Sequence, residues 1–406
     1  MLTVLNSSHD PFYNQAFEEY VFEHFREGEI FLLWQNDPAV IVGSYQNICR
    51  EVHVERLRQL GIPVIRRITG GGTVYHDLGN LNYTYISDGG AAIDYDQCLG
   101  PILAALNDIG VPARKNRTCD IAIGDLKISG SAQRMTKGRL LHHGTLLFSS
   151  DLGVLDQITT HRKNDCFQSK GTQSAICTVT NIREHLARPM TIEEFRERLL
   201  DRMVPPGSPR LTLTPEQEAE VCRLRDEKYR SWEWTWGKTP AFTYEKTGVF
   251  AGAPIRVAYQ AKRGIVSGVT VDCPLLDGGL AAALLEGGRL DPERFSSVCL
   301  RVAPDRADEL MDWLMKPDIL REREIFIMEK NIVMPRLRPE MEKGVLCAWL
   351  KEEGEPVSAG EPLFEIETDK VVNQIEATQD GVLKKQLIEE GDTVDVETPV
   401  AILETE

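Results

Sequence analysis

The segment 66–80 has the residue types needed to bind an anionic ligand. It reads Arg-Arg-Ile-Thr-Gly-Gly-Gly-Thr-Val-Tyr-His-Asp-Leu-Gly-Asn. The three glycines, Gly70, Gly71 and Gly72, let the backbone approach a ligand closely, and amides that face one way form an anion-binding concavity. The Arg67 guanidinium adds a charge-assisted donor. A glycine triplet is also common in flexible turns, and the segment is neither a Walker A loop nor a dinucleotide-binding fingerprint.

Two further polar side chains lie among apolar residues. Lys127, within the segment 120–134, is flanked by apolar residues that alternate as in a strand. It either contacts a ligand or points into water from an edge strand. His143 follows His142 and precedes a glycine and an apolar strand. It is either a ligand contact or a buried histidine with satisfied hydrogen bonds.

The C-terminal residues 331–406 contain an internal repeat. The Gly-Val-Leu sequence at 344–346 recurs at 381–383, and several later positions match at the same offset. Two copies of one small β-motif predict a flattened barrel or sandwich with approximate two-fold symmetry. The first copy continues into a further strand, so Lys370 is predicted at the tip of a hairpin spanning 363–376. An exposed amine on rigid strands suits covalent attachment, although a solvated surface lysine is the simpler interpretation.

Charge separates this C-terminal segment from the rest of the chain. The 406 residues carry a net charge of −16, and residues 331–406 hold 7 basic and 18 acidic residues, a net of −11. Residues 1–330 therefore carry only −5. This balance argues against nucleic acid as the main partner.

The remaining composition favours a cytoplasmic protein. No apolar run has the roughly 18–20 residues of a membrane helix, and the first ten residues lack the features of a secretory signal. The nine cysteines include no Cys-x-x-Cys pair. We therefore expect reduced thiols, without a disulfide framework and without a structural metal site.

The predicted helices and strands around these residues indicate an α+β fold. A helix capped by Asp10 and stopped by Gly28 is followed by short apolar strands and two helices. We predict strands at 30–34, 39–42, 64–68, 81–86 and 140–148, with helices at 51–60 and 97–109. After a helix at 192–203, a second small α+β unit is predicted, with strands at 254–259 and 264–271, helices at 278–285 and 304–315, and a charged connector at 316–329.

The repeat-containing segment closely resembles the lipoyl domain of 2-oxo acid dehydrogenase acyltransferases. The resemblance rests on Met-Pro-Arg-Leu at 334–337, Glu-Gly-Glu-Pro-Val at 353–357, Glu-Ile-Glu-Thr-Asp-Lys-Val at 365–371 and Asp-Gly-Val-Leu at 380–383. It implies that Lys370 takes lipoic acid. The Asp-Lys pair, in place of the Met-Lys-Met of biotin carriers, favours lipoate over biotin.

The rest of the chain resembles lipoate-protein ligases over nearly all of residues 1–328. Beside the segments already described, Gln-Ser-Lys-Gly-Thr-Gln-Ser at 168–174 resembles the adenylate-binding loop of that family. Trp-Glu-Trp-Thr-Trp-Gly at 232–237 resembles the end of its catalytic domain. The implied domains are a mixed-sheet catalytic domain at 1–246, a small α+β accessory domain at 247–328 and an all-β lipoyl domain at 331–406.

The resemblance implies an ATP-dependent enzyme that forms lipoyl-AMP and then transfers the lipoyl group to the lysine of a lipoyl domain, including its own Lys370. Lys127 would be the catalytic residue, and Mg²⁺ would accompany ATP. Other acceptors would be the lipoyl domains of 2-oxo acid dehydrogenases or glycine cleavage proteins, with no role for nucleic acid or membranes. The implied residues for binding ATP and lipoyl-AMP are Arg67, Gly70, Gly71, Gly72, Thr73, Val74, Tyr75, Lys127, His143 and Lys170.

Two alternatives remain open from the sequence. An ATP-independent octanoyl or lipoyl transferase shares this fold but needs a nucleophilic cysteine, for which Cys119 and Cys166 are the candidates. A lipoyl carrier with a non-catalytic ligase-like half is suggested by Ile176 and Thr178, which stand where the family usually has arginines. An octanoyl substrate also remains open.

Overall fold

The computed structural model describes residues 1–88, 95–117, 119–136, 138–159, 166–169, 171–172, 174–175, 177–315, 328–336, 341–368 and 371–405. The chain forms two compact units, Met1–Asp318 and Ile319–Glu406. Among the described residues, none of the helices combines the length and the apolar character needed to cross a membrane. The described residues include all nine cysteines and contain no disulfide bond.

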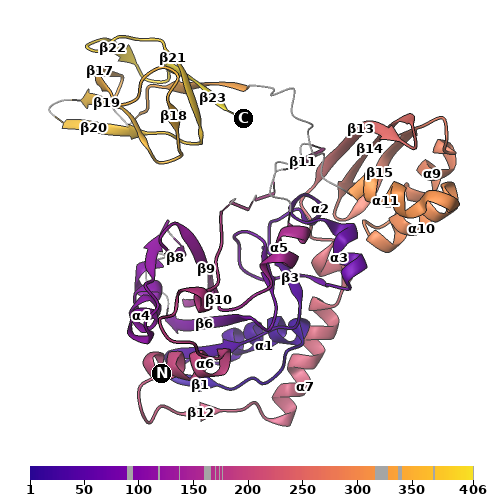
Figure 1. The fold of residues 1–406 in the computed structure, drawn as a ribbon, viewed down its shortest axis with the longest axis vertical. Helices are drawn as coiled ribbons and strands as arrows, with labels where there is room; N and C mark the ends of the chain where they lie inside the picture. The colour runs from indigo at the N-terminus through magenta and orange to yellow at the C-terminus, as the bar shows by residue number, and fades with distance from the viewer. Residues whose placement is uncertain are drawn as a thin grey trace. The chain divides into compact units, whose positions relative to one another are not determined.

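The first unit is built around an eight-stranded mixed sheet (Figure 1). Its first three strands run parallel and the others pair antiparallel. The strand order is β12 (Arg210–Leu211), β1 (Leu2–Val4), β2 (Ile30–Trp34), β6 (Asn80–Asp88), β10 (Arg139–Leu147), β9 (Leu126–Thr136), β8 (Asp120–Ile123) and β7 (Arg114–Asn116). A smaller sheet has the order β4 (Val64–Arg66), β3 (Ala39–Val42) and β5 (Val74–His76).

Helices cover both faces of the large sheet. Along β2, Phe31 and Leu33 pack with α4 (Tyr95–Ile109) and α6 (Ile192–Met203), while Ile30 and Leu32 pack with α1 (Pro11–His24) and α7 (Pro215–Leu224). A strand buried on both faces is apolar throughout, which is why β2 has no polar alternation. The other helical elements of this part are α2 (Ile48–Glu51), α3 (Val54–Leu60), α5 (Leu152–Ile158), η1 (Ile182–His185), η2 (Arg225–Tyr229) and α8 (Trp232–Thr235).

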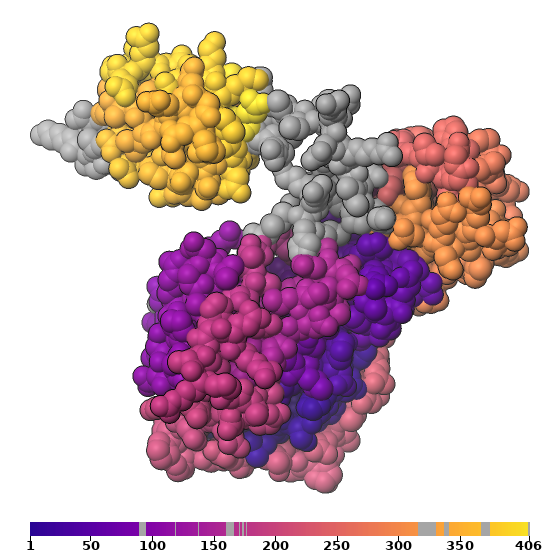
Figure 2. Space-filling model, in the orientation of Figure 1, coloured from indigo at the N-terminus to yellow at the C-terminus, as the bar shows by residue number. Residues whose placement is uncertain are grey.

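The C-terminal part of this unit shares its core with the N-terminal part. Its antiparallel sheet has the order β11 (Phe167–Ser169), β13 (Phe242–Phe250), β14 (Ala253–Lys262) and β15 (Ile265–Asp272). Tyr259 and Phe295 belong to the same apolar cluster as Val40 and Leu57, and residues 242–315, salmon to orange in Figure 2, adjoin the purple N-terminal segment. The helical elements here are α9 (Gly278–Leu285), α10 (Pro292–Val302), η3 (Pro304–Arg306) and α11 (Ala307–Met315).

Most predicted elements of this unit lie where the sequence indicated. The α+β class is confirmed, and β2, β3, α6 and α9 match their predicted bounds. The prediction for the second unit does not include α10. In the structure, Asp291 caps this helix and Pro292 is its first residue. The predicted boundary between residues 246 and 247 stays a prediction, and β13 runs across it.

The second unit is all-β and shows the internal repeat in three dimensions. One sheet has the order β16 (Met328–Val333), β23 (Pro399–Thr405), β21 (Gly381–Gln386) and β18 (Pro356–Val357); the other has β20 (Val371–Glu376), β19 (Pro362–Thr368), β17 (Lys343–Trp349) and β22 (Thr393–Asp395). Matching strands of the two repeats occupy the same places in the two sheets, as the predicted pseudo-symmetry requires. Within the described residues, strand pairing does not join the sheets into a closed barrel.

Gly264, in the hairpin between β14 and β15, tests the packing of the shared core. Its φ is +69°, and an added Cβ would lie 2.7 Å from Trp232 and 2.8 Å from the Cα of Gly237. We predict that Gly264→Ala lowers the free energy of unfolding by about 1–3 kcal/mol more than the control Gly252→Ala. Gly252 also has positive φ, +83°, but an added Cβ there would meet nothing within 4 Å.

The measurement is the urea midpoint followed by tryptophan fluorescence. Five of the six tryptophans lie in Met1–Asp318, so the signal reports mainly on that unit. Equal midpoints for the two variants would show that the contact with Trp232 does not constrain the hairpin.

Candidate active site

A cavity of about 760 Å³ in the first unit gathers most of the predicted site residues. They come from the loop between β4 and β5, from β5 itself, and from β9 and β10. The predicted residues that line it are Arg67, Gly71, Gly72, Thr73, Val74, Tyr75, Lys127 and His143. Gly70 lines a separate pocket on the other side of the glycine loop.

Lys127 is held at the wall of this cavity by an ion pair. Its Nζ lies 2.9 Å from Oδ1 of Asp120, whose side chain is 8% exposed, while the lysine side chain is 23% exposed. A Cβ at residue 130 would lie 2.9 Å from the same Nζ. Gly130 therefore provides the space across which the lysine lies, and Lys127 lines the cavity.

The loop that follows β11 docks beside the start of β9. The amide of Lys127 donates to the carbonyl of Thr178 at 2.9 Å, and the amide of Thr180 donates to the carbonyl of Lys127 at 3.0 Å. Val179 forms a parallel bridge with Lys127 and also lines the cavity. These bonds fix the backbone on both sides of the lysine.

Arg67 organises the glycine loop from behind. Its guanidinium, 5% exposed, donates to the carbonyls of Gly70, Gly72 and Ile41 and to Oγ1 of Thr69, at 2.5–3.1 Å. Burial lowers the pKa of Arg67 to about 10, an effect that the nearby carboxylate of Glu18 opposes, so the group stays charged at neutral pH.

The loop carbonyls are thus turned toward Arg67. Within the described residues, the N–H groups of Gly70, Gly71 and Gly72 have no hydrogen-bond partner. Gly71 has φ +84°, and a Cβ on Gly43 would lie 2.2 Å from the carbonyl oxygen of Gly71, so both positions require glycine. The loop presents free amides next to the cavity, which is an arrangement suited to anionic oxygens.

Ser174 links the glycine loop to the loop after β11. Its Oγ accepts from the amide of Thr73 at 2.8 Å and from Nε2 of Gln46 at 3.0 Å, and it donates to Oε2 of Glu51. Burial raises the pKa of Glu51, and its bonds with Ser174 oppose that rise. The contact holds the two loops at one edge of the cavity.

A buried histidine network also borders the cavity. His143 bonds through Nδ1 to the carboxylate of Glu18 at 2.9 Å and through Nε2 to Oγ1 of Thr69 at 2.7 Å. It is therefore a satisfied buried histidine that also lines the cavity. The ring of His76 lies against Trp34, with centroids 5.9 Å apart, and burial lowers the pKa of His76 to about 3.

Sequence reasoning missed the acidic partners in this site. Glu18 lies on the buried face of α1, and nothing in its spacing distinguishes it from a solvated helix residue. Glu51 bonds Ser174, a partner that is distant in the sequence, whereas Asp120 pairs with Lys127 across the β8–β9 hairpin. Lys170 and Lys370 lie outside the described residues.

Comparison with known proteins agrees with this arrangement. Residues 10–204 match the family model for the lipoyl protein ligase A/B catalytic domain. The chain is 35% identical over 285 residues to the lipoate-protein ligase LplJ of Bacillus subtilis, covering 68% of this chain and 84% of the relative. This chain belongs to the lipoate-protein ligases. It is also 37% identical over 267 residues to lipoate–protein ligase 1 of Staphylococcus aureus, covering 64% and 80% of the two chains.

Other matches extend to the fold and to the C-terminal unit. The solved structure of the Plasmodium falciparum protein LipL1 in complex with lipoate has a TM-score of 0.51 and 22% identity, covering 78% of this chain and 99% of that one. That similarity supports the fold of the ligase. Residues 330–403 match a family model described as biotin-requiring enzyme, so this ligase carries a C-terminal biotin/lipoyl domain.

The role of Arg67 in this ligase is testable through stability. We predict that Arg67→Lys lowers the free energy of unfolding by about 2–3 kcal/mol, because an ammonium cannot reach the four acceptors that the guanidinium reaches. Chemical denaturation measures the loss.

The control is Arg114→Lys. Arg114 also bonds a backbone carbonyl, that of Gly124, but its side chain is 56% exposed. We expect a change below about 0.5 kcal/mol there. Similar small losses in both variants would contradict the account of the glycine loop.

Proposed function

We propose that this ligase activates lipoate with ATP as lipoyl-AMP and transfers the lipoyl group to the lysine of a lipoyl domain, including its own Lys370. One observation supports the proposal most strongly. The ammonium of Lys127, anchored by Asp120, lines the same cavity as Gly71 and Gly72, whose amides are free for phosphate oxygens. A cation and a set of free amides beside one cavity suit a reaction in which negative charge develops on phosphorus-bound oxygens.

In the first step, a carboxylate oxygen of lipoate attacks the α-phosphorus of ATP, and the bond to the β-phosphate oxygen breaks to release pyrophosphate. Lys127 donates hydrogen bonds to the α-phosphate and to the lipoyl carbonyl. The amides of Gly71 and Gly72 bind phosphate oxygens without a conformational change, because Arg67 already holds the loop carbonyls away.

The acyl chain of lipoate would occupy the inner part of the cavity. Trp34, Ile41 and Leu147 provide apolar walls, and His143 also lines the cavity. Burial of an aliphatic chain against these walls contributes about 25 cal/mol per Å² of apolar surface. This binding energy holds the carboxylate near Lys127 while the reaction proceeds.

In the second step, the acceptor amine attacks the carbonyl carbon of the mixed anhydride. The bond between that carbon and the bridging oxygen breaks, AMP leaves with the oxygen, and the new amide nitrogen loses a proton to solvent. An exposed lysine with a pKa near 10.4 is neutral in roughly one molecule per 10³–10⁴ at pH 7. The reactive anhydride compensates for this scarcity.

Mg²⁺ fits this cavity as an ion held mainly by the triphosphate. The described residues contain no cluster of three or more His, Cys, Asp or Glu that could form a protein cage for a metal. Magnesium commonly takes one or two carboxylates together with substrate phosphates, and Asp120 is the nearest suitable carboxylate to Lys127. When bound, the ion neutralises charge on the phosphate oxygens.

The thiol-dependent transferase is less compatible with the site. Cys119 lies in the cavity, but burial and the adjacent Asp120 raise its pKa, which disfavours the thiolate nucleophile that such a reaction needs. Cys166 is buried and is not among the residues that line the cavity. ATP-dependent activation therefore fits these residues better.

The non-catalytic alternative rests on the missing arginines. The backbone at Thr178 is held in place, because its carbonyl accepts a hydrogen bond from the amide of Lys127 at 2.9 Å. Ile176 lies outside the described residues. This backbone contact orders the segment without a side chain of the arginine type at position 178, which supports an active enzyme.

Acceptor domains define the partners of the reaction. The C-terminal biotin/lipoyl domain carries Lys370 between β19 and β20, and we propose it as one acceptor. We further propose that lipoyl domains of 2-oxo acid dehydrogenase or glycine cleavage proteins are modified, with the reaction taking place in the cytoplasm.

Lys127→Ala tests the activation step. We predict a loss of ATP–pyrophosphate exchange of about 10²–10³-fold, because the ammonium stabilises charge in the transition state. The variant should keep its fold by circular dichroism, with a lower melting temperature because the buried carboxylate of Asp120 loses its partner. The matched control is Lys115→Ala, since Lys115 is also a strand lysine paired with an aspartate, Asp96, but does not line the cavity. Near wild-type exchange by Lys127→Ala would refute the role assigned to this lysine.

Lys370→Ala tests the acceptor. The variant should keep pyrophosphate exchange but lose the lipoyl mass increment that intact-mass spectrometry detects on the wild-type chain. Lys384→Ala, at another lysine of the same domain, should keep the increment. Peptide mapping that finds the lipoyl group on a lysine other than Lys370 would overturn the assignment.

A further inference from the structure

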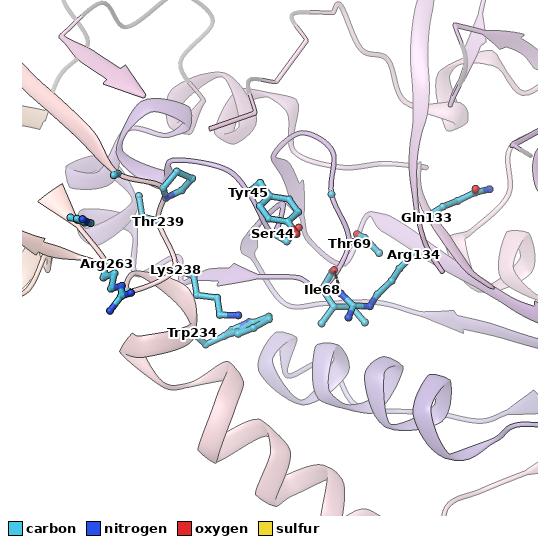
Figure 3. Close-up of a pocket in the computed structure, with 15 residues that line it drawn as sticks. Ser44, Tyr45, Ile68, Thr69, Gln133, Arg134, Trp234, Lys238, Thr239 and Arg263 are labelled. Atoms are coloured by element: carbon cyan, nitrogen blue, oxygen red, sulfur yellow. Dashed lines mark hydrogen bonds between the residues drawn. The ribbon is translucent and has the colours of Figure 1, made fainter. Parts of the chain in front are cut away.

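A second concave pocket, of about 650 Å³, lies beside the catalytic cavity and is strongly basic. Its lining includes four cations: Arg134 near the end of β9, Lys238 after α8, and Lys262 and Arg263 at the β14–β15 hairpin. Its lining contains no aspartate or glutamate. Figure 3 shows Arg134, Lys238 and Arg263 around this pocket, with Trp234 beneath Lys238.

None of these four cations has an ion-pair partner within the described residues. Arg134 donates to the backbone carbonyl of Ile68 at 2.9 Å, and the Nζ of Lys238 lies 4.4 Å from the centre of the Trp234 ring. All four side chains are exposed. Like charges gathered in a concavity raise the local positive potential and favour an anionic occupant.

Glu19 does not line the pocket, and its carboxylate already has hydrogen-bond partners. Glu19 binds Nζ of Lys228 at 2.6 Å and accepts from the hydroxyl of Tyr229 at 2.7 Å. Burial lowers the pKa of Lys228, and repulsion from Arg134 and Lys238 lowers it further. Glu19 opposes this lowering of the pKa, but it is not among the residues that line the basic pocket.

The pocket shares two walls with the catalytic cavity. Gly70 lines the basic pocket, whereas Gly71 and Gly72 line the cavity. On β9, Gln133 lines the basic pocket and Ala132 lines the cavity. A group bound in the basic pocket is thus adjacent to the loop that borders the site of Lys127.

The hairpin that carries the acceptor lysine has the opposite charge. Residues 361–376 contain five acidic residues and one basic residue, Lys370. Phe364 and Ile366 are fully buried on β19, so Glu365 between them faces outward, and it accepts from Gln374 of β20 at 3.0 Å. Glu376 at the end of β20 is exposed.

We propose that the basic pocket docks the acidic face of a lipoyl-domain hairpin and so presents its lysine to the adenylate. The proposal rests on the proposed function, since it assigns a surface to the second step. Residues 1–330 carry −5 and residues 331–406 carry −11, so long-range charge does not attract the two. A local basic pocket supplies the complementarity that the net charges lack.

The test uses the full chain with two charge reversals, Lys238→Glu and Arg263→Glu, together. The matched control is Arg198→Glu with Arg301→Glu, which changes the net charge equally at exposed sites outside both pockets. Two rates are measured for each: ATP–pyrophosphate exchange, and single-turnover transfer of the lipoyl group from preformed adenylate to Lys370.

We expect the pocket variant to exchange pyrophosphate within about twofold of the wild-type rate, to transfer about tenfold more slowly and to lose most of the salt dependence of transfer. Adding Glu365→Lys and Glu376→Lys should restore transfer in the pocket variant. The control variant should behave as wild type in both assays.

Other outcomes overturn the proposal in distinct ways. An unchanged transfer rate, or equal slowing in the control, means that the pocket does not dock the acceptor. A fall in pyrophosphate exchange means that the pocket serves ATP, and failure of the compensating variants means that the occupant is not this hairpin. Absence of exchange in the wild-type chain would instead contradict the proposed function.

Discussion

The buried guanidinium of Arg67 is the constraint on which the site depends. It donates hydrogen bonds to the carbonyls of Gly70 and Gly72. With the carbonyls turned toward Arg67, the loop amides stay free beside the cavity. Glycines at 43 and 71 are required for the backbone to pack this way. The cavity is therefore lined by the fixed amides of the loop together with cationic side chains, among them Lys127 and Arg67 itself.

The elements were predictable where one physical signal decided them. Asp10 caps α1, Pro11 begins it, and β2 and β3 are continuous apolar runs, with Pro38 and Gly43 bounding β3. The 37-residue repeat predicted the paired sheets of the second unit, since matching strands must occupy matching places. α10 was not predicted, because its local signal is limited to the cap Asp291 and Pro292, and its apolar residues pack against a core shared with distant elements.

The candidate site was predictable in its basic and glycine residues but not in its acidic ones. Lys127 and the glycine triplet stand out in the sequence, whereas Glu18, Glu51 and Asp120 are ordinary carboxylates until the fold brings them to their partners. The predicted contact of Arg67 with a ligand stays a prediction, and Arg67 lines the cavity. Its guanidinium also binds the loop carbonyls, so that the loop offers its amides to the cavity.

The transfer of oxygen-18 from the carboxylate of lipoate to AMP shows whether this enzyme forms an acyl adenylate. Lipoate labelled with oxygen-18 in both carboxylate oxygens is supplied with ATP, and the AMP released after one turnover of transfer is analysed by mass spectrometry. Attack of the carboxylate on the α-phosphorus predicts AMP that carries one labelled oxygen, because the acyl carbon–oxygen bond breaks in the second step. Attachment of the lipoyl group with unlabelled AMP, or without AMP, would contradict the account.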